Sequence, residues 1–426
     1  MNDRWERAVP LYSHKVVTPL FKLLAVLAVL AQFLVLYRET FGLGPATGLS
    51  DAYGWGIWKT FNIMVLTALG SGAFAVGFGV WVFNFKKQHS LMRMALLTSL
   101  LAYSCGLFLL GVDAGRPWNF YWILLPWNWN LHSPLAEVAI CMSIYALIPL
   151  AIENLPPVLE RFYYLQPRSR PVVERIEHVL EKYFPWIIGL AYALPMMHQS
   201  SLGALMLLAG TRVHPLWQTP WLPLLYVLAA MYMAYSCVAG TTMVCCLAYK
   251  RPLDMEVLSE AAVLTARMTV AWLAFQALDI IFRGELGAAF GLNRFVLVFW
   301  VETLCLLAAV YCLLRAVKRQ DPAMMFAGYV AAGFGGMIYR FGPPTLVFAP
   351  RPEAFYFPSF IEVMISLGFI ALAAMGFMLA VKKLAILPAP RWAWYQMAEH
   401  ARLAHPKVEL VEYAPARIEA AAASSD

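Results

Sequence analysis

The sequence is poor in charged residues. Only 13% of its 426 residues are Asp, Glu, Lys or Arg, whereas 61% are hydrophobic. This balance excludes an ordinary soluble domain, because too little polar surface exists to cover a globule that faces water. The apolar segments are long unbroken runs, and they lack the alternation that is typical of lipid-facing barrel strands. The sequence therefore predicts an all-α, polytopic integral membrane bundle.

Paired cysteine motifs are also missing. All seven cysteines fall inside predicted helices without metal-ligand spacing, and no motif for an iron–sulfur cluster or c-type haem is present. We interpret these cysteines as small apolar packing residues. Arg4, Arg7 and Lys15 precede an apolar run of full spanning length with no small-residue cleavage site. We therefore expect no cleavable signal peptide, and we expect the first helix to be retained.

Histidine is scarce at membrane depth. Only His198 of the eight histidines lies well inside a predicted span; the others are in loops, in termini or near helix ends, namely His14, His89, His132, His178, His214, His400 and His405. A b-type haem held by two histidines needs a pair inside the bundle. We therefore expect no haem, iron–sulfur cluster or metal on this chain, although Met or another unusual axial ligand remains an open alternative.

Ten apolar runs are long enough for one membrane crossing each. Basic residues gather in alternate connections, and the positive-inside rule then predicts that both termini are cytoplasmic in a bacterial inner membrane. We divide the chain into a cytoplasmic N-terminus (1–18), a ten-helix membrane domain (19–384) and a polar cytoplasmic tail (385–426) that its composition predicts to be disordered. The ten predicted spans are 19–37, 59–84, 91–111, 134–155, 184–209, 221–248, 263–282, 294–315, 323–341 and 358–381.

The outer connections are rich in aromatic residues and glycine. The connection after the third span contains Trp118, Tyr121, Trp122, Trp127 and Trp129. Such residues anchor membrane proteins at headgroup depth. The alternative is that they line the entrance for an amphipathic ligand or dock an extracytoplasmic subunit, and these roles are compatible with anchoring.

Ionisable residues at membrane depth are costly, so each one is a functional hypothesis. Nearly all of them fall in the half that faces away from the cytoplasm. They are Asp113, Arg116, Glu137, Asp279, Glu302, Arg340 and Glu362. Acids on several helices motivate a hypothesis of proton translocation through Glu302, Glu362, Asp279 and Arg340.

One histidine, an acid and a tyrosine could serve a quinone. Quinone reduction takes two electrons and two protons, so a site needs a hydrogen-bond donor to a carbonyl oxygen and a group that exchanges protons. We assign the donor to His198, proton exchange to Glu137, and a second donor to Tyr103. On these residues alone, a purely structural interpretation is as well supported as a quinone site: His198 would bond a backbone carbonyl, and Glu137 would pair with Arg116 for packing.

Several strings together carry a family resemblance. They are Asp113-Ala114-Gly115-Arg116-Pro117-Trp118-Asn119, then Glu137 with Cys141 and Tyr145, then His198-Gln199-Ser200-Ser201, His214-Pro215-Leu216-Trp217 and Phe299-Trp300-Val301-Glu302. From about residue 19 to 388 the sequence resembles the NrfD/polysulfide-reductase membrane subunits, within them the HybB branch associated with nickel–iron hydrogenases. The seventh span departs from that branch, where Arg and Glu are expected in place of Gln276 and Asp279.

The resemblance implies two four-helix bundles with flanking helices and a haem-free quinone site near the extracytoplasmic surface. It implies electron transfer between menaquinone or ubiquinone and an extracytoplasmic ferredoxin-like iron–sulfur subunit, and through that subunit a hydrogenase used in anaerobic respiration. The chain would be quinone-reactive without being catalytic alone. The positions that match the expected surroundings of the quinone are Tyr103, Asp113, Arg116, Glu137, His198 and Gln199.

Three alternatives stay open. Sibling complexes use similar subunits with sulfur-compound, nitrite or cytochrome c partners. A secondary transporter also has paired bundles and intramembrane carboxylates, but its sites are expected at the midplane, and the acids here are skewed toward one face. An inert anchor for a peripheral enzyme would need neither ten helices nor His198.

Overall fold

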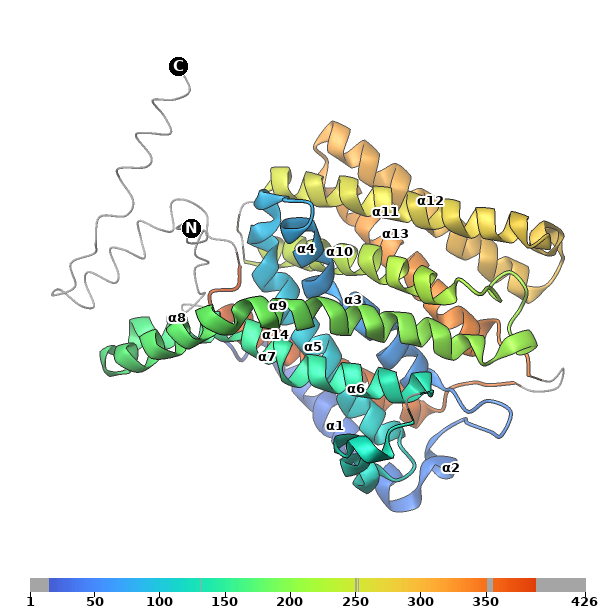
Figure 1. Ribbon diagram of the computed structural model, residues 1–426, viewed down its shortest axis with the longest axis horizontal. Coiled ribbons are helices and arrows are strands. Elements are labelled where there is room, and N and C mark those ends of the chain that lie inside the picture. The colour runs from blue at the N-terminus through green and yellow to red at the C-terminus, as the bar shows by residue number, and fades with distance from the viewer. Residues whose placement is uncertain (1–14, 131, 250, 252, 351–354, 388–426) are drawn as a thin grey trace.

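The computed structural model describes residues 15–130, 132–249, 251, 253–350 and 355–387. In this part of the chain the regular elements are helices, and one isolated bridge joins Val213 to Phe348. The predicted tail from residue 388 onward and the first 14 residues lie outside the described residues. The all-helical, polytopic architecture predicted from the sequence is confirmed (Figure 1).

Every predicted span corresponds to a helical segment. Two of them are interrupted, as their component helices show. The segments are α1 (Pro19–Phe41), η1 with α3 and α4 (Trp58–Leu66, Thr67–Leu69, Gly72–Trp81), α5 (His89–Asp113), α6 to α8 (Pro134–Leu147, Pro149–Glu153, Leu155–Leu165), α9 (Arg170–Leu207), α10 (Leu222–Ala248), α11 (Met255–Phe282), α12 (Arg294–Arg319), α13 (Pro322–Phe341) and α14 (Phe360–Lys383).

Eight of these segments in the described residues are long and apolar enough to cross a membrane. The other two are α9 and α13. Helix α9 has a polar first half and carries His198 to Ser201 in its second half, and α13 is rich in glycine and tyrosine. Both pack against α10 and lie among the spanning helices, so the bundle still contains ten helical columns (Figure 1).

The columns form two groups around α10. The first bundle contains η1 to α4, α5, α6 to α8 and α9, whose members contact one another. The second bundle contains α10, α11, α12 and α13, and α10 also contacts α9, α3 and α4 of the first bundle. Helices α1 and α14 pair with each other and flank α5. The shape agrees with the two bundles and flanking helices that the resemblance implied.

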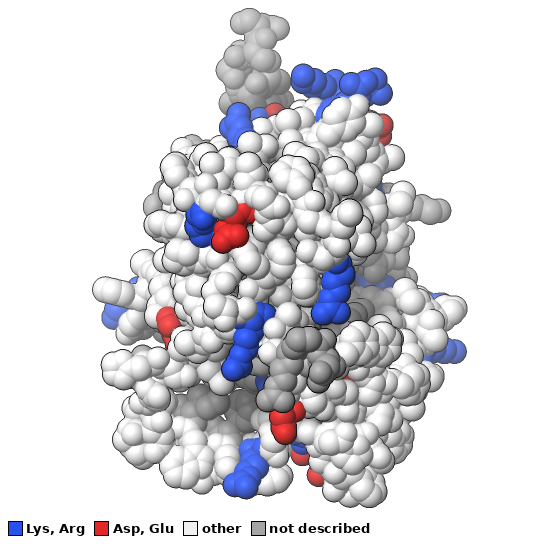
Figure 2. All heavy atoms as spheres, turned by 90° about the vertical axis from the view of Figure 1, so that its right-hand side faces the viewer, with Lys and Arg blue, Asp and Glu red and all other residues white. Residues whose placement is uncertain are grey.

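The two ends of the molecule differ in chemistry. The basic end contains Lys87, Arg93, Arg251, Arg319 and Lys383. The aromatic end contains α2 (Leu43–Ala46), η3 (Pro117–Leu124), η4 (Pro126–Asn128) and the connections that follow α9, α11 and α13. Figure 2 views the aromatic end and shows few charged side chains, scattered over a mostly neutral surface.

Small residues allow close helix packing, as lipid-embedded helices require. A Cβ on Gly328 of α13 would lie 2.7 Å from Leu313 Cγ of α12, nearer than real Cβ atoms approach. A Cβ on Gly336 would overlap Met233 of α10. The four-residue spacing of Gly328, Ala332 and Gly336 therefore marks the face by which α13 joins the second bundle.

Candidate functional site

Three helices of the first bundle converge on one buried polar cluster, which we call the His198 cluster. Its side chains are Thr67, Tyr103, His198 and Gln199, and each has no solvent-exposed surface. Thr67 begins α3 where the π-helix η1 ends, Tyr103 lies in α5, and His198 and Gln199 lie in α9. A π-helical segment adds a residue to the α-helical register, and such segments are frequent at functional sites.

The cluster is connected by hydrogen-bond distances. His198 Nδ1 lies 3.2 Å from the Val138 carbonyl oxygen of α6, and Nε2 lies 3.3 Å from Thr67 Oγ1. The Gln199 amide nitrogen donates to Thr67 Oγ1 at 3.2 Å and to the Tyr103 hydroxyl at 3.3 Å. The Tyr103 hydroxyl is also 3.3 Å from Ser71 Oγ.

The partners of His198 restrict its tautomer. A backbone carbonyl only accepts, so Nδ1 must carry a proton when it bonds Val138. In the neutral ring Nε2 is then an acceptor, and the Thr67 hydroxyl must donate to it. The same hydroxyl reaches the Ile63 carbonyl one turn earlier. If Nε2 gains a proton, it can donate to Thr67 Oγ1 while the hydroxyl turns to Ile63, so Thr67 can serve both charge states.

Several buried polar atoms near this cluster have no hydrogen-bond partner among the described residues. They are Gln199 Oε1, the Tyr145 hydroxyl and both polar atoms of the Asn62 side chain. The Tyr145 ring meets the Tyr103 ring edge-on at 4.8 Å between centroids. Unpaired buried polar groups are rare and commonly mark positions of water or ligand. The first bundle thus holds unused donors and acceptors beside His198.

Arg340 lies between the two bundles. Its guanidinium donates to the Met64 carbonyl of η1 at 3.3 Å and to the Tyr226 carbonyl of α10. It also lies 4.2 Å from the centroid of the Tyr226 ring, a cation–π contact. The side chain is fully buried and has no carboxylate partner among the described residues. Backbone carbonyls and an aromatic face therefore stabilise this charge.

The second bundle holds two buried carboxylates with fixed donors. Glu302 accepts from the indole nitrogen of Trp217 at 3.2 Å and from the Gln276 amide nitrogen at 3.3 Å. Asp279 accepts from the Thr219 hydroxyl at 2.9 Å and forms an ion pair with Arg283 at 2.9 Å. Gln276, where the sequence departs from its branch, is thus a direct partner of Glu302.

Glu362 performs a structural task at the start of α14. Its carboxylate accepts from the Ser359 backbone N–H at 2.9 Å in a capping box. It also accepts from the Gly48 N–H at 2.7 Å and from the Tyr356 hydroxyl at 2.8 Å. A Cβ on Gly56 would lie 2.7 Å from this carboxylate, so that position requires glycine. Glu362 therefore joins the connection after α2 to α14.

The remaining predicted site residues lie apart from the His198 cluster. Asp113 is the last residue of α5, about 15 Å along the helix from Tyr103, and it pairs with Lys59 at 2.8 Å. Arg116 is exposed. Glu137 is half-buried beside Val138, and no described residue is a polar partner of its side chain. The structure brings Tyr103, His198 and Gln199 together, and it does not join them to Asp113 or Arg116.

Sequence reasoning missed two contributors. Among the described residues, Thr67 is the only side chain within hydrogen-bond distance of both His198 and Gln199. Lys59 is the ion-pair partner of Asp113. Lys59 left a signal, because it is a basic residue on the side that is otherwise poor in them. Thr67 left none, since a lone threonine in an apolar helix belongs to no motif.

A family model described as polysulphide reductase, NrfD, matches residues 45–343. The chain belongs to the NrfD family. This NrfD-family chain is 33% identical over 365 residues to the probable Ni/Fe-hydrogenase 2 b-type cytochrome subunit of Escherichia coli K12, covering 85% of this chain and 91% of that protein. It is 29% identical to the menaquinone reductase integral membrane subunit of Nitratidesulfovibrio vulgaris, covering 82% of this chain and 86% of the relative.

The Escherichia coli relative is named as a b-type cytochrome subunit, and such a subunit binds haem through residues inside its helical bundle. Both ring nitrogens of His198 already face protein oxygens. Among the described residues no second histidine lies inside the bundle; His89 begins α5 and stacks edge-on with Trp81, and His214 is in a connection. The described residues do not fit a haem held by two histidines.

Proposed function

We propose that this chain is the haem-free, quinone-reactive membrane subunit of a respiratory oxidoreductase complex in a bacterial inner membrane. The observation that carries the proposal is the His198 cluster, a buried set of groups that can each donate and accept. Membership of the NrfD family and likeness to a menaquinone reductase membrane subunit support it. The basic end then faces the cytoplasm with both termini, and the aromatic end faces outward.

His198 and Tyr103 would form hydrogen bonds to the quinone oxygens. A quinone oxygen gains a proton during reduction, so its partner must change between donor and acceptor. His198 Nε2 would do this once the quinone oxygen replaces Thr67 as its partner, because the Thr67 hydroxyl can turn to the Ile63 carbonyl. Glu137, half-buried one residue from the Val138 carbonyl, is the proposed group that exchanges protons with the outside.

Access to the cluster is proposed from the lipid beside α9. Met196 and Met197 directly precede His198 and are 49% and 43% exposed. Methionine is flexible and repacks easily, which suits a position that an isoprenoid tail must pass. His198 lies about 14 Å along α9 from its end at Leu207, within the half near the aromatic end. A quinone ring there would remain close to an outer electron donor.

We assign the docking of an extracytoplasmic iron–sulfur subunit to the aromatic end. Trp118 and Trp127 are 68% and 78% exposed there, on a mostly neutral surface (Figure 2). Exposed tryptophan is enriched at protein interfaces. Likeness to the hydrogenase subunit favours a nickel–iron hydrogenase beyond it. The alternative is a related sulfur-compound or cytochrome c complex, favoured by the polysulphide reductase description of the family.

Coupled proton movement is a further part of the proposal. Arg340 lies between the bundles, and Glu302 and Asp279 are buried acids of the second bundle in the same half of the molecule. The hydroxyls of Tyr226 and Tyr339, close to Arg340, have no partner among the described residues. These atoms offer positions for waters that would connect the groups. The structural task of Glu362 makes it the weakest member of the proposed route.

The test is His198→Ala in the assembled complex. We expect quinone-linked turnover to fall at least about 100-fold, because both a donor and a proton-exchanging group are lost. Electron transfer to an artificial acceptor should persist, and co-purification of the partner subunits checks assembly. Quinone turnover that survives the change in an assembled complex would contradict the proposal and favour an inert anchor.

A further inference from the structure

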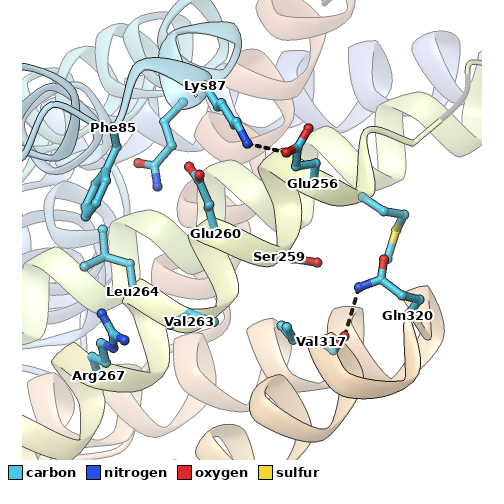
Figure 3. Close-up of a pocket in the computed structure, with 12 residues that line it drawn as sticks. Phe85, Lys87, Glu256, Ser259, Glu260, Val263, Leu264, Arg267, Val317 and Gln320 are labelled. Atoms are coloured by element: carbon cyan, nitrogen blue, oxygen red, sulfur yellow. Dashed lines mark hydrogen bonds and ion pairs between the residues drawn. The ribbon is translucent and has the colours of Figure 1, made fainter. Parts of the chain in front are cut away.

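A cleft opens at the basic end, away from the His198 cluster. It has a volume of about 530 Å³ and lies between η2 (Lys86–Gln88), the start of α11 and the end of α12. Figure 3 shows Glu256, Glu260 and Arg267 along α11, with Lys87 on one side and Val317 and Gln320 on the other. The cleft therefore lies where helix ends meet the headgroup layer.

The charges in the cleft are balanced, and half of them are already paired. Lys87 forms an ion pair with Glu256. The hydrogen bond from Lys87 to Glu256, together with the nearby charges of Glu256 and Glu260, raises the pKa of Lys87. Arg267 is exposed and has no hydrogen-bond or ion-pair partner among the described residues. Glu260 keeps one buried carboxylate oxygen, Oε2, without a partner there.

Gln88 provides an independent sign of a missing ligand. It lines the cleft and is 1% exposed. Its carbonyl oxygen accepts from the Tyr235 hydroxyl at 2.8 Å, which fixes the orientation of the amide. Its amide nitrogen has no partner among the described residues. A buried donor left unpaired costs free energy, so an acceptor in the cleft would stabilise it.

We infer that this cleft binds the headgroup of an amine-bearing phospholipid from the adjoining leaflet, with its phosphate at Arg267 and Gln88 and its ammonium at Glu260. Arg267 follows Glu260 by seven residues, about 10 Å along α11. Both side chains are long enough to reach a headgroup that lies between them. The unpaired cation Arg267 and the unpaired anion Glu260 match the two charges of a zwitterionic headgroup. The headgroup of an anionic lipid would instead lie near the carboxylates of Glu256 and Glu260 without a positive charge of its own.

The apolar residues of the cleft fit an acyl chain. Val263, Leu264 and Val317 line it between the charged groups. Val270, one turn beyond Arg267 on α11, is 48% exposed and continues the same helix face toward the membrane centre. A lipid held by its headgroup would lay a chain along this face, while the arginine extends to the headgroup layer.

The test compares three lipids with identical acyl chains on the purified, delipidated full chain. Dioleoyl phosphatidylethanolamine, phosphatidylcholine and phosphatidylglycerol are titrated, and native mass spectrometry measures the affinity of the first bound molecule. We expect phosphatidylethanolamine to bind roughly tenfold tighter than phosphatidylcholine, because only its ammonium donates N–H bonds to Glu260. Glu260→Gln should abolish that preference, Arg267→Gln should weaken the binding of both lipids, and Arg319→Gln, outside the cleft, should retain both the preference and the affinity.

Two results would overturn the inference. One is a wild-type protein that binds phosphatidylcholine or phosphatidylglycerol as tightly as phosphatidylethanolamine, a comparison that needs no variant to fold. The other is a preference that survives Glu260→Gln, or an affinity that Arg267→Gln leaves unchanged, which would locate the selective lipid elsewhere. Thermal unfolding of each variant checks that a lost preference is not a lost fold. Quinone turnover plays no part in the readout, so the lipid site stands or falls separately from the proposed function.

Discussion

The two bundles use their buried polar groups differently. In the first bundle, Thr67, Tyr103, His198 and Gln199 are groups that both donate and accept, and several neighbouring polar atoms are unpaired. In the second bundle, Glu302 and Asp279 accept from donors whose positions are fixed by packing. Adaptable groups suit a ligand that changes its protonation state, whereas the donors in the second bundle hold each carboxylate in one orientation. The difference locates the proposed quinone chemistry in the first bundle.

Among substitutions that compare the two bundles, Thr67→Val has the largest expected effect on quinone turnover. Valine keeps the shape of threonine but removes the hydroxyl that contacts His198 and Gln199. We expect quinone turnover to fall about tenfold or more, since buried polar groups lose their partner. The measurement is turnover across a range of pH. Thr67→Ser is the matched control, and it should restore both the rate and the pH profile; a valine variant with an unchanged profile would remove Thr67 from the proton chemistry.

A smaller effect on turnover is expected for Glu302→Gln in the second bundle. The substitution keeps an acceptor for Trp217 or Gln276 and removes the charge. Quinone turnover should stay within roughly threefold of wild type, because the His198 cluster is untouched. In sealed vesicles, however, the uncoupler-sensitive membrane potential should fall. A collapse of turnover similar to that of His198→Ala would erase the contrast between the bundles.

The smallest effect on turnover is expected for Glu362→Gln. The amide cannot accept from Gly48, Ser359 and Tyr356 together, so the connection after α2 loosens from α14. We expect a stability loss of about 1 to 2 kcal/mol, seen as a lower unfolding temperature of the purified complex. Turnover per assembled complex should remain within about twofold of wild type. A specific loss of proton coupling at normal stability would instead make Glu362 part of the proton route.

The fold was largely predictable because lipid allows few solutions. Hydropathy located all ten helical columns. It indicates which residues lie in lipid, however, and not where each helix begins, ends or is interrupted. Helix α9 therefore begins at Arg170, well before the predicted 184, because its polar first half continues as helix beyond the apolar run. The predicted span 134–155 is interrupted at Ile148, where the following Pro149 cannot continue the hydrogen-bond ladder.

The candidate site was predictable only in part. His198, Gln199 and Tyr103 stand out as polar residues at membrane depth, and the structure brings them together. The placement of Thr67 depends on the π-turn of η1, which shifts the register and has no signature in the sequence. The partner of Asp113 depends on the packing of η1 against α5, which brings Lys59 to it.

The central claim is that quinone binds in the first bundle, beside His198. The most direct measurement is photo-crosslinking of the intact complex with an azido-quinone, followed by mapping of the labelled peptides. Label should fall on α6 around Val138 and on α9 around Met196 to Gln199, and excess menaquinone should compete it away. Label on α11, α12 or α13, around Asp279, Glu302 or Arg340, that excess menaquinone removes would contradict the account and move the site to the second bundle.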